Sequence, residues 1–337
     1  MAMQFGQWVK KFYRLKQYGG IDSVFIGTGA FIRDDGSGTI VSAGATLSRP
    51  PYIFRHFTQL VCGEASGNFT TGATTYGSVN DAITDLDGWD SLSGEWEIIY
   101  RIAEPETPDD MASRLGQQAP IAFYKSIIDG KWKMPVYPTG SPRTAQYFLD
   151  PNGTAYKWKV GEDFIADSAQ VSFTPVDEII NEVHIRFGLY APTNTYRYDA
   201  FVGPSDSDDS VGTTDATREG YAVDTRDDYG IKSTFTANCD TIVNLDIATR
   251  LRNYIFDRFR RPRLLLKFTT LSRAIGLEPG MVCLVSNDLQ DYIPLPWYPG
   301  PNARRNWEDM KFFCKTVSFD YTAGIFAHTV VLEEIPV

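Results

Sequence analysis

Cysteine and histidine are both scarce in this chain of 337 residues, which contains four of the former and three of the latter. The cysteines are scattered, without a CxxC motif or a matching pair of histidines. This pattern predicts neither a structural zinc site nor a disulfide framework. We expect buried free thiols in a reducing compartment.

Long apolar runs and targeting segments are missing as well. No stretch reaches the ~18 consecutive apolar residues that a membrane-spanning helix needs, so no such helix is expected. The first twenty residues contain lysines but neither an apolar core nor a small-residue cleavage site. They therefore do not resemble a signal peptide.

Motifs for catalysis and for cofactor binding are also absent. Gly27-Thr28-Gly29 lacks the third glycine and the following helix of a nucleotide-binding turn, and a tight β connection is the better interpretation. The acidic loop 203–217 lacks the glycine and the terminal glutamate of a calcium loop, which favours a solvated loop. No GxSxG motif occurs, and no serine, cysteine or histidine stands in a catalytic context. The sequence predicts no catalytic residue, metal or cofactor, and we do not expect an enzyme.

The composition that remains is that of an acidic folded protein. The chain is 43% hydrophobic and 14% aromatic, which at this length predicts two or three domains with real cores. Its formal net charge is -10 and its pI is near 4.9. General binding to DNA or to anionic membranes is therefore disfavoured.

Most of the chain has the apolar/polar alternation of β-strands separated by turns. The clearest such stretches are 23–44, 94–103, 144–150, 169–175, 181–190, 195–202, 264–270, 310–321 and 325–335. Two helices are expected among them. One begins at Thr107 as N-cap, with Pro108 in its first turn. The other begins near Asp240, runs to residue 259 and carries an apolar face.

A long aromatic loop, LPWYPGPNARRNW at 295–307, suggests an interface. Tryptophan, tyrosine and arginine are enriched where proteins meet. The interface candidates are therefore Trp297, Tyr298, Arg304, Arg305 and Trp307. Packing of this loop against its own domain remains an equal alternative, and stacking of a sugar or base on the rings is a further one.

Six arginines lie between Arg250 and Arg263, which raises the question of a nucleic-acid-binding helix. On a helical wheel they do not form one stripe, as a DNA-reading helix would require. Arg258, Arg260 and Arg261 instead fall where a helix C-terminus favours positive charge. We expect Arg250 and Arg252 to pair with acids at or near a subunit interface.

An ordered set of motifs in the second half carries a resemblance to a known family. A strand at 180–187 is introduced by Asn181, and Asp228-Tyr229-Gly230, a helix to Phe259 and a strand follow. Then come Leu277-Glu278-Pro279-Gly280 with another strand, and a long hairpin. This order resembles the hub or tail-tip proteins of tailed bacteriophages.

The resemblance covers about residues 105–337, because the helix from Pro108 and the stretch 128–134 are also similar to family elements. Met281 stands where the family usually has aspartate, and Phe187 where tyrosine is common. Residues 1–100 are not matched.

The expected fold class is mainly β (α+β): a multidomain hub with tail-tube-like β-barrel or sandwich domains, each with an associated helix. We expect an N-terminal β-rich domain at 1–105, an α+β middle segment at 106–175, and a tail-tube-like β-barrel domain at 176–337 with its helix at 240–259.

The resemblance implies a structural virion protein that forms a homotrimer. As a baseplate hub or tail-tip component, it would cap or extend the tail tube and form the channel for DNA and for the tape-measure protein during genome ejection. Its implied partners are tail tube or distal tail proteins, the tape-measure protein and tail fibre or tip proteins, while DNA passes through the lumen without specific binding. The implied location is the virion tail, assembled in the host cytoplasm. The alternatives are a tail-associated carbohydrate- or receptor-binding module, or a tail peptidoglycan hydrolase.

Overall fold

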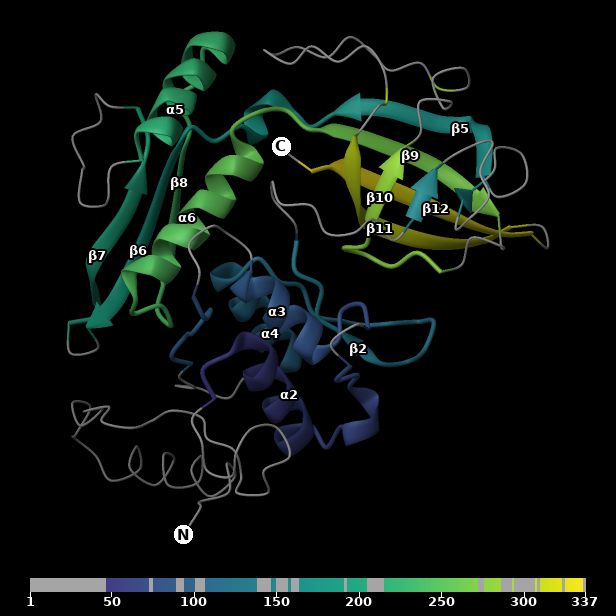
Figure 1. Ribbon diagram of the computed structural model, residues 1–337, viewed down its shortest axis with the longest axis horizontal. Coiled ribbons are helices and arrows are strands. Elements are labelled where there is room, and N and C mark those ends of the chain that lie inside the picture. The colour runs from purple at the N-terminus through teal and green to yellow at the C-terminus, as the bar shows by residue number, and fades with distance from the viewer. Residues whose placement is uncertain are drawn as a thin grey trace.

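The computed structural model describes residues 47–72, 75–88, 94–100, 107–137, 147–149, 157–158, 164–190, 193–204, 215–271, 276–285, 293, 307, 310–322 and 325–335. They form a mixed α+β fold with mainly sheet content (Figure 1). The helices are α2 (Pro50–Val61), α3 (Val79–Asp87), α4 (Pro108–Gln118), α5 (Ala216–Tyr229) and α6 (Leu245–Phe259), with short 3-10 turns at Ser66–Asn68 and Val176–Glu178. The hairpin expected at 23–44 lies outside the described residues.

The strands form three sheets among the described residues. A two-stranded hairpin consists of β1 (Tyr124–Lys125) and β2 (Trp132–Lys133). A three-stranded sheet has the order β7-β6-β8, from β6 (Glu182–Tyr190), β7 (Thr195–Val202) and β8 (Thr234–Cys239). A seven-stranded sheet has the order β4-β3-β10-β11-β12-β9-β5, from β3 (Tyr147–Leu149), β4 (Lys157–Trp158), β5 (Phe164–Phe173), β9 (Leu264–Leu271), β10 (Val282–Val285), β11 (Lys311–Thr322) and β12 (Ile325–Glu334).

Helices α2, α3 and α4 pack together with the β1–β2 hairpin in a helical lobe (Figure 1). The expected start of α4 is confirmed, because Thr107 and Asp110 form a reciprocal capping box and Pro108 opens the helix. The expectation of a β-rich segment is wrong for residues 50–87, which contain two helices. In α2, Ile53, Phe54 and Phe57 are buried at helical spacing, so packing outweighs the strand preference of aromatic and β-branched residues.

Residues 94–100 alternate as expected but form no strand. Trp96, Ile98 and Tyr100 are buried. The Ile98 N–H donates to the carbonyl of Ser48 and the Ile99 N–H to the carbonyl of Thr241, at 2.8 and 2.7 Å. The segment is extended, but two different neighbours accept its hydrogen bonds, and no strand of the described residues pairs with it.

The three-stranded sheet carries helices on one face. Val183, Ile185 and Phe187 are buried in the same core as Leu251 of α6, as the alternation along β6 predicts. Helix α6 begins at Leu245 after the N-cap Asn244, five residues later than the expected start near Asp240. Helix α5, which is not among the expected helices, is joined to α6 by Arg218, which donates to Asp257. It ends at Gly230 in the left-handed conformation.

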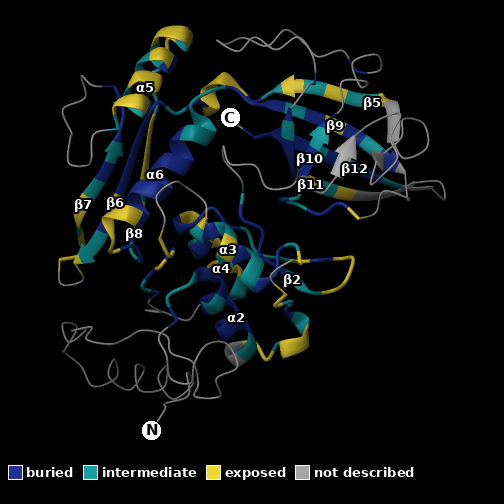
Figure 2. Cartoon of the chain, viewed as in Figure 1, coloured by how far each residue is buried: buried dark blue, intermediate teal, exposed yellow. Residues whose placement is uncertain are grey.

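The seven-stranded sheet curls into a half-barrel whose longest contact is the hairpin of β11 and β12 (Figure 1). Leu264, Leu266 and Phe268 of β9 are fully buried, which confirms the expected alternation. Figure 2 shows the buried residues concentrated in this sheet, in α6 and in the centre of the helical lobe.

The helices and strands pack around two main hydrophobic cores. The boundaries between these cores differ from the domain boundaries expected at residues 105 and 175. One core joins α2, α3 and α4 to the three-stranded sheet and α6. The other lies on the half-barrel, whose strands come both from 147–173 and from 264–334. Pairing between strands far apart in sequence, such as β5 with β9 and β3 with β10, produces this grouping.

Candidate assembly site

The six arginines between Arg250 and Arg263 all contact groups of this chain. Arg250 and Arg252 donate to backbone carbonyls, and Arg258 and Arg263 lie against Glu333. The other two are Arg260, 4.2 Å from the ring centre of Tyr221, and Arg261, 3.7 Å from Glu334. The stretch therefore binds one part of the protein to another, as the absence of a single arginine stripe indicated.

Arg250 closes the C-terminal end of helix α3. Its guanidinium donates to the carbonyls of Leu86, Asp87 and Gly94 and stacks on the ring of Trp96 at 4.9 Å. The side chain is only 1% exposed. A cation at a helix C-terminus is favourable because carbonyls without helical partners meet there. The expected pairing with acids across a subunit interface stays a prediction, but the described contacts of this guanidinium lie within the chain.

Arg252 is equally buried, on the side of α6 that faces β7. It donates to the carbonyl of Phe201 at 2.7 Å and to the side chain of Asn253 at 2.8 Å. Burial lowers the pKa of Arg252, while Asp215, 3.9 Å away, acts in the opposite direction. This acid belongs to the same chain, and its pairing with Arg252 helps to hold α5 against α6.

Glu333 forms the centre of a charged junction between α6 and the half-barrel. It is 0% exposed and lies 2.8 Å from Arg263, 3.1 Å from Arg258 and 2.9 Å from Lys315. Arg258 donates a hydrogen bond to Glu333, whereas Arg263 acts mainly through charge. Burial raises the pKa of Glu333, but the three cations outweigh it and the pKa lies below that of an ordinary glutamate.

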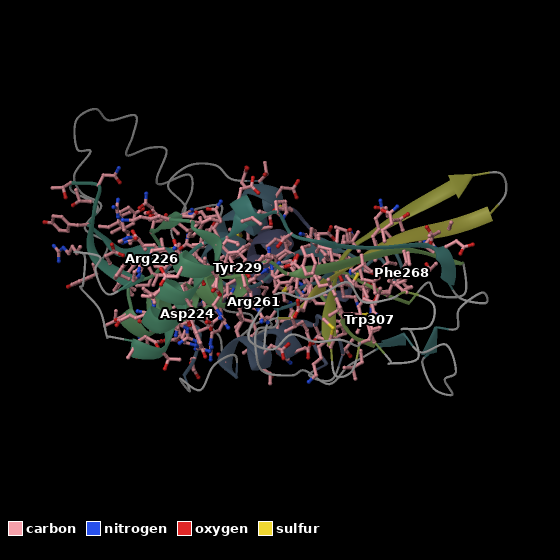
Figure 3. The ribbon with its side chains drawn as sticks, turned by 90° about the horizontal axis from the view of Figure 1, so that it is seen from above. Asp224, Arg226, Tyr229, Arg261, Phe268 and Trp307 are labelled. Atoms are coloured by element: carbon pink, nitrogen blue, oxygen red, sulfur yellow. The ribbon has the colours of Figure 1, made fainter. Side chains whose placement is uncertain are left out.

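Aromatic rings complete this junction. Those of Tyr137, Phe259 and Phe313 lie 5.0–5.4 Å from the Arg258 guanidinium carbon. Such contacts favour a cation that has lost most of its water. Figure 3 shows Arg261 and Tyr229 near this region, between the helices on one side and Phe268 and Trp307 on the other.

The loop Leu277-Glu278-Pro279-Gly280 makes a second junction, between the half-barrel and the helical lobe. Tyr76 and Tyr124 both donate their hydroxyls to the carbonyl of Pro279. Lys133 lies 3.8 Å from Glu278. Burial raises the pKa of Tyr124, so its hydroxyl remains a donor throughout the pH range in which proteins are folded. The Pro-Gly motif of the resemblance thus has a physical role in joining the two cores.

Gly280 allows this close approach, and its replacement by alanine should be costly. Its φ is +86°, and an added Cβ would lie 2.5 Å from the Tyr76 hydroxyl and 2.6 Å from the Pro135 Cβ. Backbone strain and overpacking together predict a loss of about 3 kcal/mol in unfolding free energy, measured by urea denaturation. Gly63→Ala is the control, because Gly63 has φ +71° with nothing near its Cβ and should lose only about 1 kcal/mol. Equal losses would show that the contact with Tyr76 and Pro135 does not restrict this position.

Of the loop 295–307, only Trp307 falls among the described residues; Trp297, Tyr298, Arg304 and Arg305 lie outside them. Trp307 is 0% exposed and donates its indole N–H to the carbonyl of Ile293 at 2.7 Å. Its ring lies 6.1 Å from that of Phe312, inside the half-barrel core (Figure 3). The assignment of Trp307 to an interface is therefore corrected: this residue packs within its own domain.

The outer face of the three-stranded sheet is polar, and the sequence pattern did not mark it as a site. His184 lies between Asp199 and Glu182, with ring nitrogens 2.8 and 3.2 Å from the carboxylate oxygens. Thr234 donates to the same Glu182 oxygen at 3.2 Å. These contacts tie β6 to β7 and to β8. The signal in the sequence is the position of Glu182, His184 and Arg186 at every second residue of the strand expected at 181–190, a pattern that is equally typical of the solvent side of an ordinary strand.

Arginines stand at the exposed end of this face. Arg186 is exposed beside His184, and Arg197 lies 4.1 Å above the ring of Tyr190. No group of three or more His, Cys, Asp or Glu side chains in the described part of the chain is placed to hold a metal ion. Within the same part, no helix is long and apolar enough to cross a membrane.

The chain is similar, at low identity, to several solved structures, among them tail proteins and a chain of a virion. One is the tail protein from Neisseria meningitidis MC58, with 11% identity, 70% of this chain and 57% of that chain covered, and a TM-score of 0.35. Another is the 43 kDa tail protein of prophage MuSo2 from Shewanella oneidensis, with 10% identity, 72% and 59% covered, and a TM-score of 0.37. A third is a chain of the native gene transfer agent virion, with 12% identity, 76% and 46% covered, and a TM-score of 0.40.

This chain thus spans about half to three fifths of the length of those chains. No protein-family model matches it. No curated protein matches its sequence either.

Proposed function

We propose that this protein is a structural component of a bacteriophage tail. Within the tail, we propose that it is a baseplate hub or tail-tip protein that forms a homotrimer at the end of the tail tube. Its channel would pass DNA and the tape-measure protein, and its partners would be tube, tip and fibre proteins. No catalytic step is part of this proposal.

The observation that carries the proposal is the way the resembling motifs are connected in space. Asn181, which introduces the motif strand β6, donates to the carbonyl of Ile231 at 2.7 Å. Its side-chain oxygen accepts from the N–H of Ser233 at 2.9 Å. It thereby fixes the segment that follows Gly230, and β8 pairs in parallel with β6. Two motifs that are ~50 residues apart are thus parts of one supersecondary unit.

Charge and architecture are compatible with this role. A net charge of -10 disfavours strong binding of nucleic acid to the protein surface, as a DNA channel requires. The half-barrel and the three-stranded sheet both have edge strands, β4 and β5 in one and β7 and β8 in the other. Exposed edges are common places for strand pairing between subunits.

Electron microscopy of the assembled particle tests the proposal. Particles carrying this chain with a gold-labelled affinity tag should show the label at the distal end of the tail, with threefold averaging improving the density. Label on the capsid, along the whole tail or on lateral fibres would contradict a hub or tip position. Native mass spectrometry of the purified chain with its tail partners should show three copies.

A further inference from the structure

Two surfaces of the lobe that contains α5, α6 and the three-stranded sheet have opposite exposed charge. Helices α5 and α6 lie on one side of this sheet, and no helix of the described residues covers its other side (Figure 1). We call the exposed stripe of α5 the acidic stripe, made of Thr217, Gly220, Tyr221, Asp224, Asp227 and Asp228. We call the outer end of the sheet the arginine face, made of Arg186, Tyr190, Thr195 and Arg197.

The acidic stripe is a continuous surface along one side of α5. Its members recur at intervals of three and four residues, which places them on one face of a helix. Ala222 and Thr225, on the opposite face, are buried, and the Thr225 hydroxyl donates to the carbonyl of Arg260 at the end of α6. Tyr221 is 39% exposed although Arg260 stacks on it. Figure 3 shows Asp224 and Arg226 at the end of the molecule away from the half-barrel.

The charges of this stripe are largely uncompensated within the described chain. Asp227 has an exposed contact with Arg226, and no ion pair joins Asp224 or Asp228 to another described residue. Gly220 lies in the middle of the helix, where glycine costs about 1 kcal/mol relative to alanine. An added Cβ there would meet nothing within 4 Å, so this glycine has no packing role inside the chain.

The arginine face offers the complementary charge. Arg186 and Arg197 form no ion pair with another described residue. The acids beside them are engaged elsewhere, because Glu182 and Asp199 both lie against His184. Tyr190 is 41% exposed beneath Arg197, and tyrosine with arginine is a combination enriched at protein interfaces.

We propose that the acidic stripe of one copy docks on the arginine face of the next copy. The two surfaces differ in position and in sign of charge, so the contact is heterologous, as in a ring, and not a twofold contact of identical surfaces. Arg186 and Arg197 would pair with Asp224 and Asp228, and Gly220 would let the neighbouring sheet approach α5 closely. The inference rests on the proposed assembly into a multimer and names the surfaces that form it.

Charge reversal in the full chain tests the contact, with sedimentation velocity as the readout. The double variant Arg186→Glu/Arg197→Glu and the double variant Asp224→Lys/Asp228→Lys should each associate about 100-fold more weakly than the wild type, because like charges would face each other. The quadruple variant that combines them should regain association, since the charges are exchanged. Asp109→Lys/Asp177→Lys, at exposed acids of α4 and of the turn after β5, is the control and should associate normally.

Association of either double variant at wild-type strength would overturn the inference, as would a quadruple variant that remains dissociated. A wild-type chain that does not self-associate would also overturn it. Circular dichroism of every variant establishes that it is folded. The result is separable from the test of the proposed function: a chain located at the tail tip whose double variants still associate refutes only the contact. Charge exchange that restores association in a chain absent from the tail refutes only the tail assignment.

Discussion

Glu333→Gln should lower the free energy of unfolding by about 3–5 kcal/mol, which is the usual cost of removing one partner of a buried ion pair. Glutamine has nearly the shape of glutamate, so the change removes charge with little change of volume. Arg258 and Arg263 would then remain buried without their carboxylate. Because these residues join α6 to the half-barrel, the loss should appear in thermal and in urea unfolding alike.

Glu178→Gln is the matched control for this substitution. Glu178 lies 3.4 Å from the same Arg263, but its side chain is 48% exposed. Exposed ion pairs contribute about 0–1 kcal/mol, so this variant should be nearly as stable as the wild type. Equal losses of unfolding free energy in the two variants would mean that the burial of Glu333 does not determine how much it stabilises the fold.

The pH dependence of stability gives a second test of the same carboxylate. The pKa of Glu333 is lower in the folded chain than in the unfolded chain. The carboxylate therefore contributes its full stabilisation at pH values above its pKa in the unfolded chain, about 4.3. This stabilisation disappears as the pH falls through the lower pKa of the folded chain. The difference in free energy of unfolding between the wild type and Glu333→Gln should therefore shrink below about pH 4.3. A constant difference between the two proteins down to pH 3 would contradict this.

The strands of the half-barrel could be predicted because a local pattern determines them. Leu264, Leu266 and Phe268 alternate with Leu265, Lys267 and Thr269, which are less buried, and the sheet buries the first three side chains. Helix α4 was equally visible, because its start depends on Thr107, Pro108 and Asp110, which are close in sequence. In such cases the physics that decides the structure acts within a few residues.

Helices α2 and α5 were missed for different reasons. The aromatic and β-branched residues of α2 suit a strand, whereas the prolines in its first turn and its contacts with α3 and α4 favour the helix. Six of the fourteen residues of helix α5 are charged, and its buried face is narrow, at Ala222 and Thr225. Its N-cap, Asp215, lies in a stretch that was interpreted as one acidic loop to residue 217.

The site could be predicted only in outline. That the arginines of 250–263 do not form a DNA-reading stripe was visible on a helical wheel. Their partners were not, because Leu86 and Gly94 lie about 160 residues before Arg250 and Glu333 lies 75 residues after Arg258. The acidic stripe also required knowledge that 216–229 is a helix. Contacts between distant segments are set by the packing of whole cores, which no local pattern specifies.

Arg250→Met should lower the free energy of unfolding by about 2–4 kcal/mol. Methionine keeps much of the apolar length of the arginine stem but leaves the buried carbonyl of Leu86, and the partly buried ones of Asp87 and Gly94, without these donors. The contact with the ring of Trp96 would be lost as well. Hydrogen exchange should become faster in α3, because its C-terminal turn depends on this guanidinium.

Arg226→Met is the control, since Arg226 is partly exposed and its contact with Asp227 is a surface pair. It should change the free energy of unfolding by less than about 1 kcal/mol.

The same comparison distinguishes a role of Arg250 within the chain from a role between subunits. If Arg250→Met unfolds like the wild type but dissociates the multimer, Arg250 acts between subunits, as the sequence suggested. If the free energy of unfolding of the isolated chain falls, and hydrogen exchange in α3 becomes faster, the guanidinium acts within the chain. We expect the second result, because a side chain that is 1% exposed in a single copy has almost no surface left to offer a partner.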